Sequence, residues 1–229
     1  MTVPEIRDAV RSIDLFAALE DDQLDLLLDR HRETGHEADQ VIVMEQDWGE
    51  SLFLLRSGLA KVRTYTAEGD EVVMSLLGQG DVFGEMAALD GDVRSADVVA
   101  LTSLRLVKLR VAPFASLLEK QARFALALAR LEASRLRDLN RRFALQTADA
   151  TTRMLDALAY LARKSSVNAD PQALIPPLAQ RELALVAGLA RETASRTLSK
   201  LRTRGTLAEE NGGLRLLDLQ PLSKRGLLD

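Results

Sequence analysis

Residues 78–89 read Gly-Gln-Gly-Asp-Val-Phe-Gly-Glu-Met-Ala-Ala-Leu, and Arg94-Ser95-Ala96 follow five residues later. The three glycines fall at positions i, i+2 and i+6, whereas a dinucleotide-binding turn has its third glycine at i+5. The apolar stretches on either side are short, which indicates neighbouring strands rather than a strand that leads into a long helix. The segment therefore predicts a turn inside a β-domain and argues against a dinucleotide site.

The same segment carries the groups that a ribose phosphate needs. Gly84 allows backbone amides to approach an anion, and a short helical turn after it can present its N-terminal amides. Arg94 can neutralise a phosphate, and Ser95 can donate a hydroxyl hydrogen bond. Glu85 suits a ribose hydroxyl, because a carboxylate accepts hydrogen bonds but repels phosphate. The alternative is an ordinary salt bridge between Glu85 and Arg94 in a tight turn.

The chain around this segment predicts a β-sandwich or jelly roll. Between residues 34 and 110, short apolar stretches alternate with glycines at regular spacing, which is typical of that architecture. The clearest stretches are residues 41–44, 52–55, 72–77, 98–101 and 104–109. The first 30 residues predict a short helical lead-in, so that the first domain spans residues 1–112 of an α+β chain.

Residues 114–146 contain neither glycine nor proline, and Pro113 suits the first turn of a helix. One unbroken helix of about 33 residues would be roughly 50 Å long. Its apolar stripe is interrupted at Glu132 and Arg135. Such a helix extends beyond the β-domain, which leaves part of its apolar stripe uncovered. We therefore expect residues 113–146 to pair with the same helix of a second copy. The alternative is a helix packed only on its own β-domain.

Residues 147–229 predict a winged helix-turn-helix. A helix over 152–162 and a loop over 164–177 precede two short helices split at Gly188, and a β-hairpin turns at Asn211-Gly212-Gly213. This part holds 12 Lys and Arg against 9 Asp and Glu, a net charge of +3, whereas residues 1–146 hold 18 against 25, a net charge of −7. Only the basic part suits a DNA backbone.

The second of these short helices begins with a pattern suited to base edges. Arg191, Glu192 and Arg196 lie near its N-terminus, the part of a helix-turn-helix that enters the major groove. Arginine reads guanine with two hydrogen bonds, and glutamate accepts one from the cytosine amino group. Lys200, further along, adds charge for the phosphate backbone. The alternative is a solvated amphipathic face.

Other site chemistries have little support in this sequence. The chain has no cysteine, which excludes disulfides, thiolate zinc sites and iron–sulfur clusters. His31 and His36 lack the spacing of a zinc hydrolase and are expected in a solvated loop, so we expect neither a metal nor haem. No catalytic motif stands out, and we expect no enzyme; a nucleotide hydrolase is the alternative. Without a signal peptide or a long apolar run, a cytoplasmic protein with no membrane contact is expected.

Phe83-Gly84-Glu85 and Arg94-Ser95-Ala96 together resemble the phosphate-binding cassette of the cyclic AMP receptor protein (CRP/FNR) family of transcription regulators. Gln180-Arg181-Glu182 and the Arg191-Glu192-Thr193-x-x-Arg196 pattern resemble that family's helix-turn-helix. The similarity runs through nearly the whole chain. It implies a cyclic-nucleotide-binding β-roll, a long dimerisation helix and a winged helix-turn-helix.

The resemblance also implies roles for individual residues. Glu85 would hold the ribose 2′-hydroxyl, and Arg94 would pair with the cyclic phosphate. The other expected ligand contacts are Val62, Met74, Ser75, Gly84, Met86 and Ser95. Leu139-Asn140 stand where the family has a Thr-Ser pair for the base; Asn140 can still bond a purine, which leaves cyclic AMP or cyclic GMP open. The expected DNA contacts, on palindromic TGTGA-like sites, are Gln180, Arg191, Glu192, Thr193, Arg196 and Lys200, with Thr193 at a phosphate.

The implied function is that of a homodimer in which a bound nucleotide shifts the population towards a DNA-binding conformation. Double-stranded DNA and RNA polymerase are the expected macromolecular partners. The alternative is a regulator that binds DNA constitutively, or with another ligand, and whose β-roll takes no cyclic nucleotide.

Overall fold

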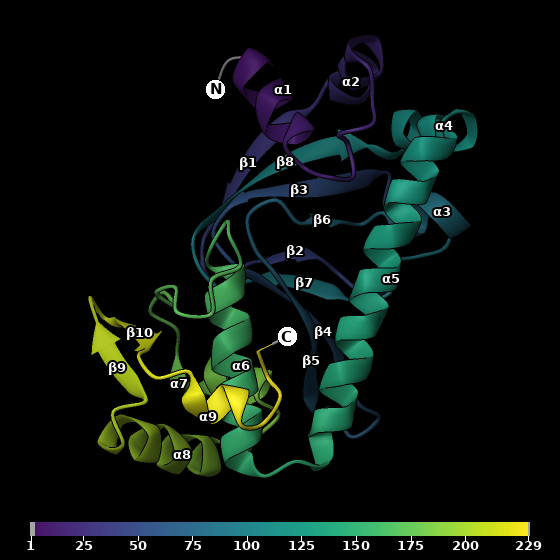
Figure 1. Ribbon diagram of the computed structural model, residues 1–229. Helices are drawn as coiled ribbons and strands as arrows, with labels where there is room; N and C mark the ends of the chain where they lie inside the picture. Colours follow the sequence, from purple (N-terminus) through teal and green to yellow (C-terminus); the bar gives the residue numbers. More distant parts are fainter. Residues whose placement is uncertain (1–2, 229) are drawn as a thin grey trace.

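Two antiparallel four-stranded sheets dominate the N-terminal half in the computed structural model, which describes residues 3–228 (Figure 1). The first sheet has the order β1 (Arg32–His36), β8 (Leu104–Arg110), β3 (Ser51–Ser57) and β6 (Val82–Phe83). The second has the order β2 (Val41–Val43), β7 (Asp97–Ala100), β4 (Ala60–Tyr65) and β5 (Glu71–Leu77). A buried apolar cluster draws side chains from both sheets, among them the stacked rings of Phe53 and Phe83. The predicted β-roll is confirmed.

All five apolar stretches named from the sequence fall largely within strands. The prediction of a solvated loop was wrong for His36, which ends β1 and pairs with Leu104 of β8. His31 lies just before β1, where its ring Nδ1 is 2.7 Å from the carbonyl oxygen of Leu28. Among the described residues, no group of three or more His, Cys, Asp or Glu side chains is arranged to hold a metal ion.

The helices at the top of the molecule in Figure 1 show that the prediction of one unbroken helix was wrong. The helical lead-in is α1 (Val3–Arg11) and α2 (Asp21–Leu28), and the long segment divides into α4 (Val111–Lys120) and α5 (Ala122–Ala144). Gln121 between them is extended, with φ −121° and ψ 91°. A 3-10 turn, Leu145–Thr147, follows α5.

A buried aromatic contact explains the break at Gln121. The rings of Phe114 in α4 and Phe124 in α5 meet edge to face with centroids 5.2 Å apart, and Phe16 lies 6.0 Å from Phe124. In a continuous helix, positions 114 and 124 would be roughly 15 Å apart along the axis. The bend brings both rings into one core with α1 and α2. The 23 residues of α5 then span about 35 Å.

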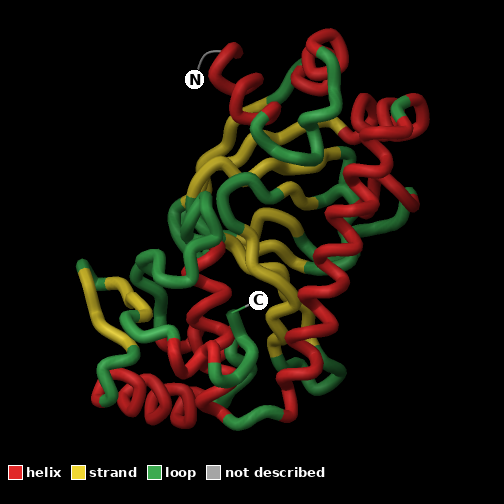
Figure 2. Tube along the Cα trace, in the orientation of Figure 1, coloured by secondary structure: helices red, strands yellow, loops and turns green. Residues whose placement is uncertain are grey.

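The C-terminal part has the predicted order of elements. It consists of α6 (Ala150–Lys164), α7 (Gln180–Val186), α8 (Arg191–Thr203), the hairpin β9 (Leu207–Glu210) and β10 (Gly213–Leu216), and α9 (Gln220–Ser223). Asp149 caps α6, because its carboxylate accepts hydrogen bonds from the hydroxyl of Thr152 and from the amides of Thr152 and Thr151, and these contacts lower the pKa of Asp149. Figure 2 shows this part as helices and a small hairpin beside the main sheets.

The apolar core of the winged helix-turn-helix extends onto the β-roll. Leu59, Val73, Leu76 and Leu101 of the β-roll belong to the same buried cluster as the apolar residues of α6, α7 and α8. Helix α6 lies against β5, as Figure 1 also shows. The two halves of one chain therefore share apolar packing as well as a covalent link.

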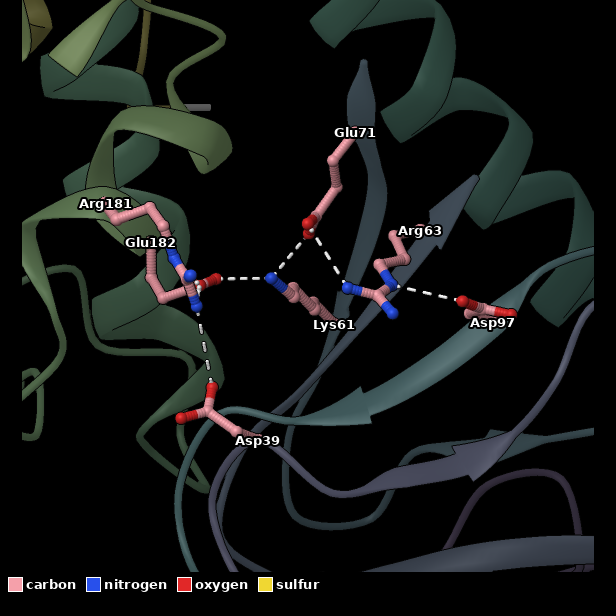
Figure 3. A network of polar contacts seen from close by, with 7 residues as sticks. All are labelled: Asp39, Lys61, Arg63, Glu71, Asp97, Arg181 and Glu182. Carbon is pink, nitrogen blue, oxygen red and sulfur yellow. Dashed lines mark hydrogen bonds and ion pairs between the residues drawn. The ribbon is translucent and has the colours of Figure 1, made fainter. Parts of the chain in front are cut away.

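A buried network of charges joins the same two halves (Figure 3). Lys61 of β4 is 2% exposed, and its Nζ lies 2.5 Å from Glu71 Oε1 of β5 and 2.5 Å from Glu182 Oε2 of α7. Arg63 continues the network, 3.2 Å from Glu71 and 3.2 Å from Asp97. Helix α7, the first helix of the helix-turn-helix motif, is thus tied by an ion pair to the second sheet.

We expect Lys61→Met to destabilise the chain, because it leaves the carboxylates of Glu71 and Glu182 without their shared cation. Removing one partner of a buried ion pair costs about 3–5 kcal/mol. The free energy of unfolding from urea denaturation measures the loss. The double variant Lys61→Met/Glu182→Leu should recover part of it, and Arg202→Ala, which removes a cation 41% exposed, should cost less than about 1 kcal/mol. A Lys61→Met variant as stable as the wild type would contradict the assignment.

Candidate functional site

A cavity of about 610 Å³ lies between the second sheet, the turn after β6 and helix α5. This volume is within the range of small-molecule sites in proteins. Eight of the nine ligand-contact residues predicted from the sequence line it: Val62, Met74, Ser75, Gly84, Glu85, Met86, Arg94 and Ser95. Asn140 does not line it and is exposed on α5, whereas its neighbour Leu139 does.

Arg94 is held against the backbone at one end of this cavity. It is 7% exposed, and its guanidinium donates hydrogen bonds to the carbonyl oxygen of Gly84 at 2.9 Å and to that of Ser51. Burial lowers the pKa of Arg94, and the nearby charge of Glu85 opposes this effect. A β-carbon on Gly49 would lie 2.1 Å from Arg94 Nη2, so the turn at Gly49 leaves just enough room for the guanidinium.

Gly84 has φ +83°, a conformation that residues with a side chain rarely adopt. A β-carbon there would lie 2.7 Å from Arg94 Nη1 and 3.1 Å from the carbonyl oxygen of Ser51. Gly78 meets a different constraint, because a β-carbon there would lie 2.1 Å from the carbonyl oxygen of Lys164. The lack of a side chain at Gly84 therefore makes room for Arg94 in the cavity, and at Gly78 it makes room for the end of α6.

Glu85 precedes the short helix α3 (Met86–Asp90) and is 4% exposed. Its Oε1 accepts a hydrogen bond from Arg135 Nη1 of α5 at 2.6 Å. Its Oε2 is buried and has no hydrogen-bond partner among the described residues. The alternative of a simple Glu85–Arg94 salt bridge is therefore wrong, since Arg135 is the ion-pair partner of Glu85. A buried oxygen without a partner marks a place where a donor is expected to bind.

The sequence patterns did not indicate other residues of the cavity wall, among them Glu132, Arg135, Arg142 and Tyr160. The first three come from α5, and their signal was the interruption of its apolar stripe by charged side chains. The guanidinium of Arg142 lies 5.0 Å from the centroid of the Tyr160 ring and donates to the carbonyl oxygen of Met74 at 2.8 Å. The hydroxyl of Tyr160 lies 3.2 Å from Ser75 Oγ, a contact that no sequence pattern signalled.

Helix α8 presents a charged outer face. Ala194, Leu198 and Leu201 are buried on its inner side. The charged residues predicted to contact DNA, all exposed, are Arg191, Glu192, Arg196 and Lys200. The other two predicted contacts are half-buried: Thr193 lies on α8, and Gln180 begins α7. The structure thus collects the predicted DNA contacts on the helix-turn-helix, with the charged ones on one helix.

Comparison with known proteins agrees with both halves of this architecture. The model of the cyclic nucleotide-binding domain matches residues 34–121, and that of the Crp-like helix-turn-helix domain matches residues 152–225. The cyclic AMP receptor protein of Thermus thermophilus is 32% identical over 197 residues, which cover 84% of this chain and 87% of that protein. The CRP-like cAMP-activated global transcriptional regulator of Mycobacterium tuberculosis is 26% identical over 186 residues, which cover 80% and 83%.

Among solved structures, FixK2 from Bradyrhizobium japonicum shares the fold, with a TM-score of 0.74 at 21% identity over 85% of this chain and 96% of that one. The fold and the cavity define a transcription regulator with a cyclic nucleotide-binding domain and a DNA-binding helix-turn-helix. This chain belongs to the cyclic AMP receptor protein (CRP/FNR) family. No helix in residues 3–228 has the length and apolar character needed to cross a bilayer.

We expect Gly84→Ala to destabilise the chain more than Gly80→Ala. Both glycines have positive φ, +83° and +90°, so both variants carry a backbone strain of about 1–3 kcal/mol. Only the Gly84 variant adds a contact with Arg94, because a β-carbon on Gly80 meets nothing within 4 Å. Thermal or urea denaturation of the two variants measures the extra cost of the contacts that the Gly84 variant makes with Arg94 and with the carbonyl oxygen of Ser51. Equal losses would show that Arg94 is not held against Gly84.

Proposed function

We propose that this chain is a homodimeric transcription regulator that responds to a cyclic nucleotide, cyclic AMP in the first instance, and binds palindromic TGTGA-like DNA sites. The observation that carries the proposal is the buried, unpartnered Oε2 of Glu85 in the same cavity as the guanidinium of Arg94. Glu85 Oε2 can accept a hydrogen bond from a hydroxyl group, and Arg94 can pair with an anion. A ribose cyclic phosphate has both groups. The choice of cyclic AMP is supported by the names of the Thermus and Mycobacterium relatives.

In this proposal Arg94 pairs with the cyclic phosphate, and Ser95 and the backbone amide of Met86 donate to it. Glu85 Oε2 accepts a hydrogen bond from the ribose 2′-hydroxyl, while Arg135 holds Oε1 in place. The sheet side chains Val62, Met74 and Ser75, together with the backbone of Gly84, line the rest of the space. Asn140 does not line the cavity of its own chain and in this proposal would contact a purine only from a second copy. Cyclic GMP stays an alternative ligand.

The proposed dimer is supported by apolar side chains that α5 leaves in solvent. Leu136 is 58% exposed, Leu139 39% and Phe143 70%. Leu136, Leu139 and Phe143 recur at helical spacing and need a partner, which the same face of a second α5 supplies. A two-fold dimer would present two α8 helices to the two halves of a palindrome. In each, Arg191, Glu192 and Arg196 would read bases, while Lys200, Thr193 and Gln180 would contact the backbone. Contact with RNA polymerase stays a prediction.

Strand β4 offers a route between the two sites. Successive side chains of a strand point to opposite faces. Val62 and Thr64 line the cavity. The alternate residues Lys61 and Arg63 belong to the charge network that reaches α7. A ligand that shifts β4 would therefore alter the position of the helix-turn-helix.

A second candidate is a regulator that takes another ligand or none. The hydrogen-bonding contact between the hydroxyls of Tyr160 and Ser75 favours it, because it engages a group expected to contact the nucleotide.

We expect Arg94→Ala to weaken cyclic AMP binding by roughly thirtyfold or more, since a buried charge pair contributes about 2 kcal/mol or more to binding. Isothermal titration calorimetry measures the dissociation constant. Arg105→Ala removes the same charge from the exposed side of β8 and should bind like the wild type. Wild-type protein that binds neither cyclic AMP nor cyclic GMP, or an Arg94→Ala variant that binds equally well, would refute the ligand assignment.

A further inference from the structure

Glu132 of α5 places a second carboxylate in the cavity, next to Glu85. Its side chain is 32% exposed and lines the cavity wall. Arg135 serves both carboxylates, because its Nη1 lies 2.6 Å from Glu85 Oε1 and 2.9 Å from Glu132 Oε1. Arg135 also donates to the carbonyl oxygen of Val82, which fixes the guanidinium at this end of the cavity. One guanidinium nitrogen is therefore shared by two carboxylates.

The charges at this end of the cavity balance without a ligand. Arg94 and Arg135 contribute two positive charges, and Glu85 and Glu132 contribute two negative ones. A cyclic nucleotide adds one further negative charge, which leaves an uncompensated charge in a cavity where water screens charges less than in bulk solvent. If Glu132 were protonated, the extra negative charge would be removed, and Arg135 would form an ion pair with Glu85 only. Glu85 cannot play this part in the proposed site, because its carboxylate is needed to accept the ribose hydroxyl.

The remaining charged groups of the cavity wall pair with other residues or lie further from Glu132. Lys164 of α6 pairs with Asp81 before β6 at 2.6 Å, and Arg142 donates to the backbone of β5. Asp138 is exposed on α5, one turn beyond Arg135 and further from Glu132. Glu132 is therefore the titratable group of the wall that lies next to Glu85 and Arg135.

We propose that Glu132 sets the affinity of this site for its anionic ligand: its carboxylate competes with Glu85 for Arg135 and repels the phosphate, so that the nucleotide binds more tightly once Glu132 is protonated. The inference rests on the proposed cyclic-nucleotide function. It makes Glu132 a specificity-determining residue, which favours ligands of low negative charge. It also makes binding depend on pH.

The electrostatic surroundings agree with this role. Burial raises the pKa of Glu132 above the ordinary value of 4.5; Arg135 lowers it, and the charge of Glu85 raises it further. A bound anion raises the pKa again, because it disfavours the charged carboxylate. Binding is thus linked to proton uptake. The affinity is highest below the raised pKa of free Glu132 and falls as the pH rises through the window between the pKa of the free and of the bound protein.

Titration calorimetry with cyclic AMP between pH 5 and 8 tests the inference in the full-length protein. We expect the wild-type affinity to fall as the pH rises, by about tenfold for each unit by which ligand binding raises the pKa of Glu132. Glu132→Gln should bind with a nearly constant affinity and more tightly than the wild type at pH 8. Glu132→Met provides a second neutral variant, and Glu119→Gln removes the same charge from an exposed position of α4. Glu119→Gln should keep the wild-type profile.

A second readout separates proton uptake from a general change in packing. The binding enthalpy of the wild type should depend on the ionisation enthalpy of the buffer within the titration window, and that of Glu132→Gln should not. The inference is overturned if the neutral variants keep the pH dependence of the wild type, or if they bind more weakly at pH 8. Wild-type protein that binds no cyclic nucleotide at any pH would instead overturn the proposed function, and this inference with it.

Discussion

The contact of Lys61 with Glu71 and Glu182 fixes how the two halves of the chain lie together. An ammonium group that is 2% exposed must be paired, and its partners come from β5 and from the first helix of the helix-turn-helix. The apolar cluster that unites Leu76 of β5 with Leu158 of α6 would tolerate some sliding, whereas a buried ion pair demands a defined geometry. The position of α7, and through it that of α8, therefore depends on the sheet that also lines the cavity.

A second shared charge, Arg135, plays the corresponding part inside the cavity. It orients Glu85 from a helix that the sequence marks for dimerisation, so the ligand site is completed by α5 rather than by the β-roll alone. Charged residues that interrupt an apolar helical stripe are costly unless they find partners, and here the partners are those of the ligand site. The same helix thus forms one wall of the cavity. It also exposes Leu136 and Phe143, an apolar face that a second copy of the chain could cover.

Local sequence patterns predicted much of the fold because each pattern has a local cause. Glycines, apolar stretches and the Asn211-Gly212 turn placed the sheets and the wing. Strands β1 and β4 were not predicted, because their sequences, Arg-Glu-Thr-Gly-His and Ala-Lys-Val-Arg-Thr-Tyr, are too polar to form an apolar stretch. Their polar side chains are exposed or paired on one face of the sheet. The break at Gln121 depends on the packing of Phe124 between Phe114 and Phe16, a contact between distant segments that helix propensity does not report. For the same reason the cavity residues of the turn after β6 could be predicted from the sequence, and the contacts of Arg135 and Tyr160 could not.

The central claim is that occupation of the cavity controls the helix-turn-helix. The most direct test is the affinity of the full-length protein for a TGTGA palindrome, measured by gel shift with and without saturating cyclic AMP. We expect cyclic AMP to tighten DNA binding at least about fivefold, the lower end of typical allosteric coupling. Equal affinity in both conditions, from a protein that binds cyclic AMP in solution, would contradict the claim and favour a constitutive DNA-binding regulator.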